Sequence, residues 1–145
     1  MTFQWSLTVD CADPAALARF WSLALGYVPK PPPEGFDSWE AWLLRHGVPE
    51  AEWDDGAYLC DPEGRLPGIS FLKVPEGKSA KNRWHIDIPV GGGRAVPAAR
   101  RWPRVEAAAE RLVAAGAAIL SRHDVDGVPD HLVMSDPEGN EFCLV

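Results

Sequence analysis

The sequence predicts an α+β fold built from two copies of one unit, in which a strand, a helix and three further strands follow one another (βαβββ). Two repeats indicate this arrangement. The turn motif Asp-Pro-Glu-Gly occurs at residues 61–64 and again at 136–139, and a predicted strand follows each copy. A strand that alternates tryptophan and aliphatic residues with polar ones also occurs twice, at 3–10 and at 84–90.

The repeats divide the 145 residues into two modules of one compact domain. We expect the first module to span residues 1–76 and to carry a helical insertion at about 31–55. The second module is expected over residues 84–145. Residues 77–83 are polar, basic and without periodicity, which is typical of a linker.

The first predicted strand, residues 3–10, places its side chains alternately on two faces. One face carries Trp5, Leu7 and Val9, and the other carries Ser6, Thr8 and Asp10. A helix follows, because Asp13 can cap its N-terminus, Pro14 suits its first position and Gly26 can end it. Residues 27–28 are predicted to form a short strand.

The insertion begins with a loop, since residues 29–35 contain four prolines. Asp37, followed three residues later by Glu40, has the spacing of a helix N-cap and predicts a second helix that ends before Gly47. Residues 49–55 are acidic and are predicted to be irregular. The helix brings Trp39 and Trp42 onto its apolar side, where they either cover a sheet opening as core or line an aromatic pocket as a lid.

Strands over 57–60 and 69–74 lie on either side of the first Asp-Pro-Glu-Gly turn. The second module starts with the strand over 84–90, and a loop of three glycines follows it. The next helix is expected to begin at Pro103 and to end at Gly116.

The chain is predicted to finish with strands over 118–121, 131–134 and 141–145, and with a turn-rich loop over 123–130. The last strand again alternates, with Glu141 and Cys143 on one face and Phe142 and Leu144 on the other. A carboxylate within this otherwise apolar strand requires an explanation, which is either a functional or a structural role for Glu141.

The bulk composition excludes several classes of partner. A net charge of −7 disfavours binding to nucleic acid. No apolar run is long enough to span a membrane, and the N-terminus lacks the pattern of a signal peptide, so we expect a cytoplasmic protein with no membrane partner. Three widely spaced cysteines indicate neither a disulfide framework nor a thiolate zinc site. Seven tryptophans suit a pocket for a planar ligand or a subunit interface.

The repeated unit and four sequence segments resemble the vicinal oxygen chelate superfamily of glyoxalases, bleomycin-resistance proteins and extradiol dioxygenases. The chain is most similar to its actinobacterial glyoxalase-like branch. The segments are residues 10–14 together with 18–21, then 52–55, 81–87 and 136–145. The resemblance implies that two curved sheets surround a cavity for a small-molecule ligand. We also expect a homodimer, in which the modules either close on each other within one chain or are exchanged between chains.

The resemblance also implies a metal site, because metal-dependent members take one ligand from the first strand and one from the last strand of each module. His85 and Glu141 stand at these positions in the second module. In the first module Ser6 stands at a lost ligand position, and either Ser70 or Leu72 stands at the other. The implied cofactor is a divalent metal, Zn, Ni, Mn or Fe, at an incomplete site, or none.

The alternation of the strands leads to the same pair. His85 and Glu141 each lie on a polar strand face, so a shared cavity would make them an acid/base pair, or a hydrogen-bonded pair with a structural role. Asp87 shares the face of His85, whereas His131 faces either the cavity or solvent. The other expected pocket residues are Trp5, Ser6, Trp39 and Trp42.

Two functions are consistent with these residues. The first is an enzyme of the lyase, isomerase or dioxygenase kind that uses His85 and Glu141 in a reduced metal site or an acid/base site. The alternative is a non-catalytic binding or resistance protein that sequesters an aromatic or antibiotic-like ligand in a tryptophan-lined cavity. A third arrangement, in which side chains fill the cavity and the domain acts through dimerisation, is also compatible with the sequence.

Overall fold

The computed structural model describes residues 1–145 as two compact units, Met1–Gly77 and Lys78–Val145. In chain order the first unit contains β1 (Leu7–Cys11), α1 (Pro14–Leu25), β2 (Val28–Pro29), α2 (Trp39–Arg45), the 3-10 helix η1 (Glu50–Asp55), β3 (Gly56–Cys60) and β4 (Ile69–Lys73). The second unit contains β5 (Ile86–Ile88), α3 (Ala98–Ala114), β6 (Ala118–Val125), β7 (Val128–Ser135) and β8 (Glu141–Leu144).

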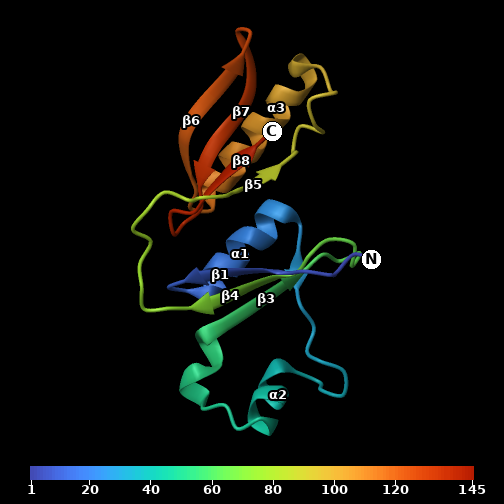
Figure 1. Ribbon diagram of the computed structural model, residues 1–145, viewed down its shortest axis with the longest axis vertical. Helices are drawn as coiled ribbons and strands as arrows, with labels where there is room; N and C mark the ends of the chain where they lie inside the picture. Colours follow the sequence, from blue (N-terminus) through green and yellow to red (C-terminus); the bar gives the residue numbers. More distant parts are fainter. The chain divides into compact units, whose positions relative to one another are not determined.

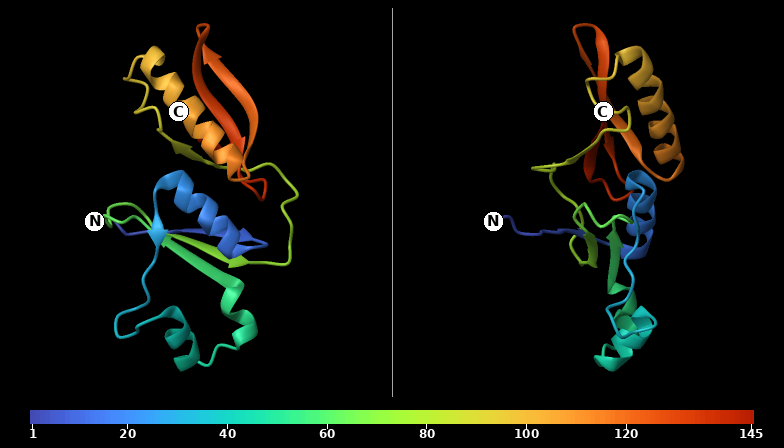
Figure 2. Two further views of the ribbon diagram at one scale, coloured as in Figure 1. Left: turned by 180° about the vertical axis from the view of Figure 1, so that it is seen from behind. Right: turned by 90° about the vertical axis from the view of Figure 1, so that its right-hand side faces the viewer.

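Both units have the same sheet topology. The strand orders are β1-β4-β3-β2 and β5-β8-β7-β6, so that the first strand of each unit lies beside its fourth. The first and fourth strands are parallel, and the remaining pairs are antiparallel. In each unit the long helix covers one face of the sheet (Figure 1, Figure 2). The predicted α+β fold of two βαβββ modules is thereby confirmed, while a cavity between the two sheets stays a prediction.

Each core lies between a helix and the sheet face that it covers. In the first unit the most deeply buried side chains are Leu17 from α1 and Phe71 from β4. In the second unit Val105 and Leu112 of α3 are buried with Leu132, Met134, Phe142 and Leu144 from β7 and β8. Alternation along β7 and β8 therefore turns their intervening side chains to the opposite, open face of the second sheet.

The first helix is capped as predicted. The Asp13 carboxylate accepts a hydrogen bond from the backbone N–H of Ala16 at 3.0 Å, and Gly26 ends the helix with a φ of 72°. The cap of α2 is Ser38 rather than Asp37, because the Ser38 hydroxyl accepts from the backbone N–H of Ala41 at 3.1 Å.

The two Asp-Pro-Glu-Gly turns share one hydrogen-bonding scheme. Asp61 accepts three backbone N–H bonds, of 2.9 to 3.1 Å, from the residues two, four and five positions later. Asp136 accepts two, both of 2.9 Å, from the residues two and four positions later. The bond from Glu63 is the main reason that the pKa of Asp61 is lowered. The repeated motif is thus explained by turn geometry, since a carboxylate satisfies the free backbone donors of each turn.

The predicted start of the third helix was wrong. The helix α3 begins at Ala98, and Pro103 lies inside it. Proline fixes a φ close to the helical value and removes only one hydrogen bond near the N-terminus, so it is tolerated there. Arg101, which precedes Pro103, is buried together with Val105. The side chains packed against the sheet therefore extend the helix upstream of the proline.

The predicted loop over 123–130 was also wrong, because β6 and β7 continue through it as a hairpin. The pairing extends to Val125 and Val128, and only Asp126 and Gly127 remain as the turn. Both have positive φ, 51° and 76°. Asp-Gly favours this conformation in two-residue hairpins, and the sequence therefore contained the signal.

Two predicted strands start later than expected. The strands β1 and β5 begin at Leu7 and Ile86, so Trp5 and Trp84 precede them. These rings are 68% and 67% exposed, and the tryptophans do not extend the buried faces. The segment over 49–55, predicted to be irregular, contains the 3-10 helix η1.

Candidate functional site

The open face of the second sheet gathers the site residues predicted for the second module. In the parallel pair of β5 and β8, Asp87 lies opposite Cys143. His85 and Glu141 each precede these residues by two positions, so alternation brings all four side chains to the face that α3 does not cover. We call His85, Asp87, Glu141 and Cys143 the open-face cluster.

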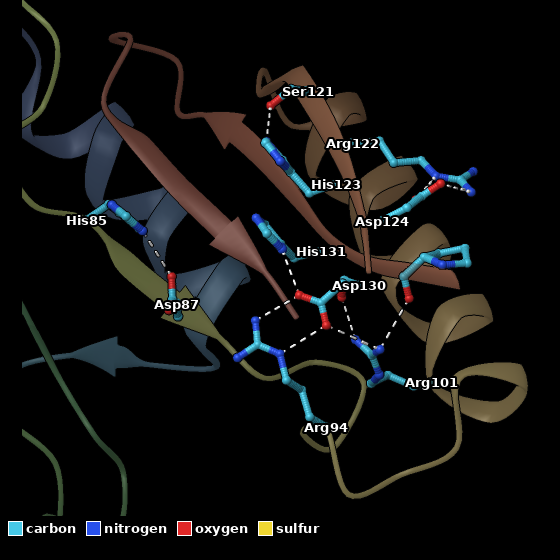
Figure 3. A network of polar contacts seen from close by, with 11 residues as sticks. His85, Asp87, Arg94, Arg101, Ser121, Arg122, His123, Asp124, Asp130 and His131 are labelled. Carbon is cyan, nitrogen blue, oxygen red and sulfur yellow. Dashed lines mark hydrogen bonds and ion pairs between the residues drawn. The ribbon is translucent and has the colours of Figure 1, made fainter. Parts of the chain in front are cut away.

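Three members of the open-face cluster form a compact donor set. His85 Nε2 lies 3.2 Å from Asp87 Oδ1, in the contact drawn in Figure 3. The ligand atoms of His85, Asp87 and Cys143 all lie within 4.8 Å of one another. His85 and Asp87 are exposed, whereas Cys143 is buried. An imidazole nitrogen, a carboxylate oxygen and a sulfur are the donors that zinc and related divalent ions accept.

Glu141 has a different partner. Its carboxylate forms an ion pair with the ammonium group of Lys81, and no hydrogen bond or ion pair joins Glu141 to His85. The Glu141 side chain is 19% exposed, compared with 76% for Lys81. The lysine comes from the segment predicted to be a linker. Glu141 is therefore on the expected face, but its carboxylate is already paired with the ammonium group of Lys81.

The thiol of Cys143 is held in its neutral form. Burial is the main cause that raises its pKa, to about 11, and the nearby Asp87 carboxylate adds to this effect. Without a bound cation, Cys143 is therefore a protonated thiol at neutral pH, and not a nucleophilic thiolate. A divalent ion would displace this proton, because thiolate is the form of cysteine that ligates metals.

Two histidines lie farther along the same face. His131 on β7 pairs with His123 on β6, and their rings stack with centroids 4.6 Å apart and an interplanar angle of 3°. One nitrogen of each ring also has a polar partner. His123 Nε2 lies 3.0 Å from the Ser121 hydroxyl, and His131 Nδ1 lies 2.9 Å from Asp130 (Figure 3). His131 is half-buried on the open face.

Asp130 is buried and supports His131 as the centre of an ion network. Its carboxylate accepts two hydrogen bonds from the guanidinium of Arg94, at 3.0 and 2.8 Å. Arg101 of α3, itself buried, donates to the backbone carbonyls of Asp130 and Pro129 (Figure 3). The hydrogen bond from Arg94, followed by that from His131, lowers the pKa of Asp130. The carboxylate is thus ionised and holds one nitrogen of His131 in a fixed direction.

The first unit does not repeat this chemistry. Ser6 precedes β1 and is exposed. The register pairs Thr8 with Ser70 and Asp10 with Leu72, so neither candidate counterpart of Glu141 lies opposite Ser6. Of the described residues, only those of the second unit bring three potential metal ligands together.

Two predicted pocket tryptophans lie elsewhere in the first unit. Trp39 and Trp42 border a hollow of about 700 Å³ between α1, the insertion and β3. The third predicted pocket tryptophan, Trp5, does not border this hollow. The insertion leaves the sheet after β2, where Pro29 pairs with Leu59 near the end of β3, and rejoins it at the start of β3 (Figure 1).

Paired βαβββ modules with polar side chains on an open sheet face define the class of vicinal oxygen chelate proteins. The glyoxalase-like domain family matches residues 6–145, and the chain belongs to this family. No sequence among the curated proteins matches the chain.

Solved structures share the fold at low sequence identity. One is described as a possible glyoxalase from Bacillus cereus, with a TM-score of 0.60, 14% identity and coverage of 100% of this chain and 99% of that one. A glyoxalase/bleomycin resistance protein/dioxygenase family enzyme from Burkholderia phytofirmans has a TM-score of 0.58, 14% identity and coverage of 96% and 94%. The fosfomycin resistance protein FosX from Listeria monocytogenes, complexed with Mn(II) and sulfate, has a TM-score of 0.60, 12% identity and coverage of 99% and 89%.

Sequence reasoning identified part of this site and missed the rest. It named His85, Glu141, Asp87 and His131, but treated Cys143 as a buried strand residue and His123 as structural. The alternation that pairs Cys143 with Glu141 was the available signal for the cysteine. No local pattern indicated the network of Asp130, which joins a predicted loop to a segment without a predicted element.

The structure has no helix that is both long and apolar enough to cross a membrane.

Proposed function

We propose that the protein is a metal-dependent glyoxalase-like enzyme that acts on a small molecule with neighbouring oxygen atoms. The observation that supports this function is the convergence of His85, Asp87 and Cys143 on one sheet face, with ligand atoms within 4.8 Å of one another. Glu141 precedes Cys143 by two positions on the same strand and supplies a fourth donor. The bound ion would be zinc, nickel, manganese or iron, and it would supply Lewis-acid polarisation of substrate oxygens.

The donor set fits such an ion with small movements. Ligands of a tetrahedral zinc ion lie about 2.0–2.3 Å from the metal, and hence about 3.3–3.8 Å from one another. Donor atoms within 4.8 Å would have to approach by about 1 Å. The side chains of His85 and Asp87 are exposed, so no packed core opposes this movement.

The residues of the chain have separate roles in this proposal. Asp87 holds Nε2 of His85 through their 3.2 Å contact, and a metal bound at Nε2 would replace this contact and join the two ligands. Cys143 keeps its proton until a cation replaces it, because burial raises the pKa of the thiol. Lys81 neutralises Glu141 in the absence of another cation and has to release it when the donor set closes. Lys81 thus lowers the affinity of the site and protects an otherwise unpaired carboxylate.

The donor set favours lyase or isomerase chemistry over dioxygenase chemistry. Non-haem iron oxygenases commonly use two histidines and one carboxylate as ligands. The open-face cluster contains one histidine, and His131 is directed toward Asp130. One imidazole with two carboxylates and a thiol is better suited to polarising an oxygen and moving a proton.

Divalent metal binding to the purified, EDTA-treated protein tests this function. We expect calorimetric titration with Zn²⁺ or Mn²⁺ to give one site per chain. The His85→Ala variant should lose at least about tenfold in affinity, the range observed when metal sites are disturbed. The matched control is His46→Ala, which removes a histidine from the end of α2 in the other unit. Equal affinity of wild type and His85→Ala would contradict the proposal.

A further inference from the structure

The aromatic insertion of the first unit has no buried residue of its own. Neither α2 nor η1 contains a buried side chain, although together they carry three tryptophans. Trp39, Trp42 and Trp53 are all half-buried and border the hollow of about 700 Å³. Large rings that only packed a core would bury their faces. Rings that converge on a hollow and stay half-buried are typical of a ligand pocket.

The wall of the hollow opposite the tryptophans is built from small side chains. Ala15, Ala18 and Ser22 lie on one stripe of α1 and border the hollow. Because these side chains are short, the space between α1 and the insertion is not filled by the helix. Its volume lies within the range of about 300–1,000 Å³ that is typical of small-molecule pockets.

The indole N–H groups of two of the rings are engaged with backbone carbonyls. The indole N–H of Trp39 donates to the carbonyl of Lys30 at 2.8 Å, and that of Trp53 donates to the carbonyl of Val48 at 3.1 Å. Trp39 also stacks on Tyr58, with centroids 5.0 Å apart. Since the indole donors of Trp39 and Trp53 are already satisfied, a ligand would meet the ring surfaces of these residues rather than their N–H groups.

Two cations at the pocket are available to an anionic group. Arg19 and Lys30 border it without an ion-pair partner, and Glu52 is the corresponding unpaired carboxylate. The remaining charged side chain, Asp55, is paired with Lys73 at 3.4 Å. Because Asp55 is engaged with Lys73, Arg19 and Lys30 are the cations left to meet an anionic group of a ligand.

We propose that this hollow is a second binding site, which takes a planar aromatic molecule carrying an anionic group. The ring would lie among the tryptophans, and the anion would lie near Arg19 and Lys30. The site lies wholly within the first unit, and it does not depend on the proposed metal site of the second. Ligand binding to the hollow can therefore be measured with EDTA present, and the failure of either proposal leaves the other intact.

Calorimetric titration with anilinonaphthalene sulfonate, a planar aromatic anion, tests the site. We expect one probe molecule per chain. Trp42→Ala should weaken binding by about tenfold, the factor that corresponds to one good aromatic contact. Ala15→Phe should abolish it, because the new ring occupies the hollow from an exposed position of α1 that imposes no core strain. The matched control is Trp5→Ala, which removes an exposed tryptophan that does not border the pocket.

Several results would overturn the proposal. Unchanged binding by Ala15→Phe would show that the probe lies elsewhere, as would equal losses in Trp5→Ala and Trp42→Ala. Tighter binding of the cationic dye thioflavin T than of the sulfonate would refute the assignment of charge. Sedimentation would reveal the other occupant, a second copy of the chain. If Trp42→Ala dissociates a dimer and the wild-type dimer does not bind the probe, the hollow is a subunit interface.

Discussion

Replacing Asp130 by asparagine tests the ion network that supports His131. The Asp130 side chain is 8% exposed, and it accepts two hydrogen bonds from Arg94 and one from His131. The substitution keeps the size of the side chain but removes its charge. Arg101, whose side chain is 6% exposed, then loses the carboxylate that neutralises it at 3.7 Å.

The expected loss in unfolding free energy is about 3 kcal/mol. Hydrogen bonds to charged groups contribute about 1.5–3 kcal/mol each. The hydrogen bonds from Arg94 contribute less than this to the unfolding free energy, because its side chain is 68% exposed and solvent screens its charge. The uncompensated Arg101 dominates, and breaking a buried pair typically costs about 3–5 kcal/mol. For a chain of this length the corresponding fall in Tm is about 10 °C.

The difference between wild type and Asp130→Asn should depend on pH in one direction. The pKa of Asp130 is lowered in the folded protein, so its carboxylate stabilises the fold fully above the unfolded value of about 4. The contribution is then lost as the pH falls from about 4 toward the lower pKa of the folded state. Urea unfolding at neutral pH and at several values below pH 4 measures this difference.

The matched control is Asp124→Asn, which breaks an exposed ion pair. Asp124 accepts from Arg122 at 2.8 Å, but the two side chains are 43% and 50% exposed. Its removal should change stability by less than about 0.5 kcal/mol. The reasoning is refuted if Asp130→Asn costs no more than this control, or if its cost is the same at neutral and at acidic pH.

Two other substitutions test separate parts of the structure. Lys81→Ala should release Glu141 and tighten Zn²⁺ binding severalfold in calorimetric titration, and an unchanged or weaker affinity would show that Lys81 does not compete with the metal. Gly127→Ala should destabilise the protein by about 1 kcal/mol, because this residue has a φ of 76° in the hairpin turn. Thermal unfolding measures this loss. The control is Gly77→Ala, at a position that has open space and no positive φ. Equal effects of the two substitutions would contradict the assigned conformation of the hairpin turn.

The fold was largely predictable because its signals are local. Turn carboxylates such as Asp61 and Asp136, and the Asp13 cap, act within a few residues of their own position. The errors arose where a distant contact decided the outcome. The start of α3 upstream of Pro103 depends on the burial of Arg101 against the carbonyl groups of β7.

The candidate site was predictable as a set of residues sharing a sheet face, but not as a set of contacts. Alternation along two strands is sufficient to bring His85 and Glu141 to one face. Their actual partners, Asp87 and Lys81, depend on side-chain conformations and on the path of residues 78–85. No strand periodicity contains that information.

The central claim is that the open-face cluster of the second sheet binds a divalent ion. Crystals of the protein loaded with Zn²⁺ test it most directly, through the anomalous scattering of the metal. We predict one strong peak per chain, about 2.0–2.1 Å from His85 Nε2 and about 2.3 Å from the sulfur of Cys143. Glu141 should then have left Lys81. A metal peak at other residues, or no peak while His85 stays paired with Asp87, would contradict the claim.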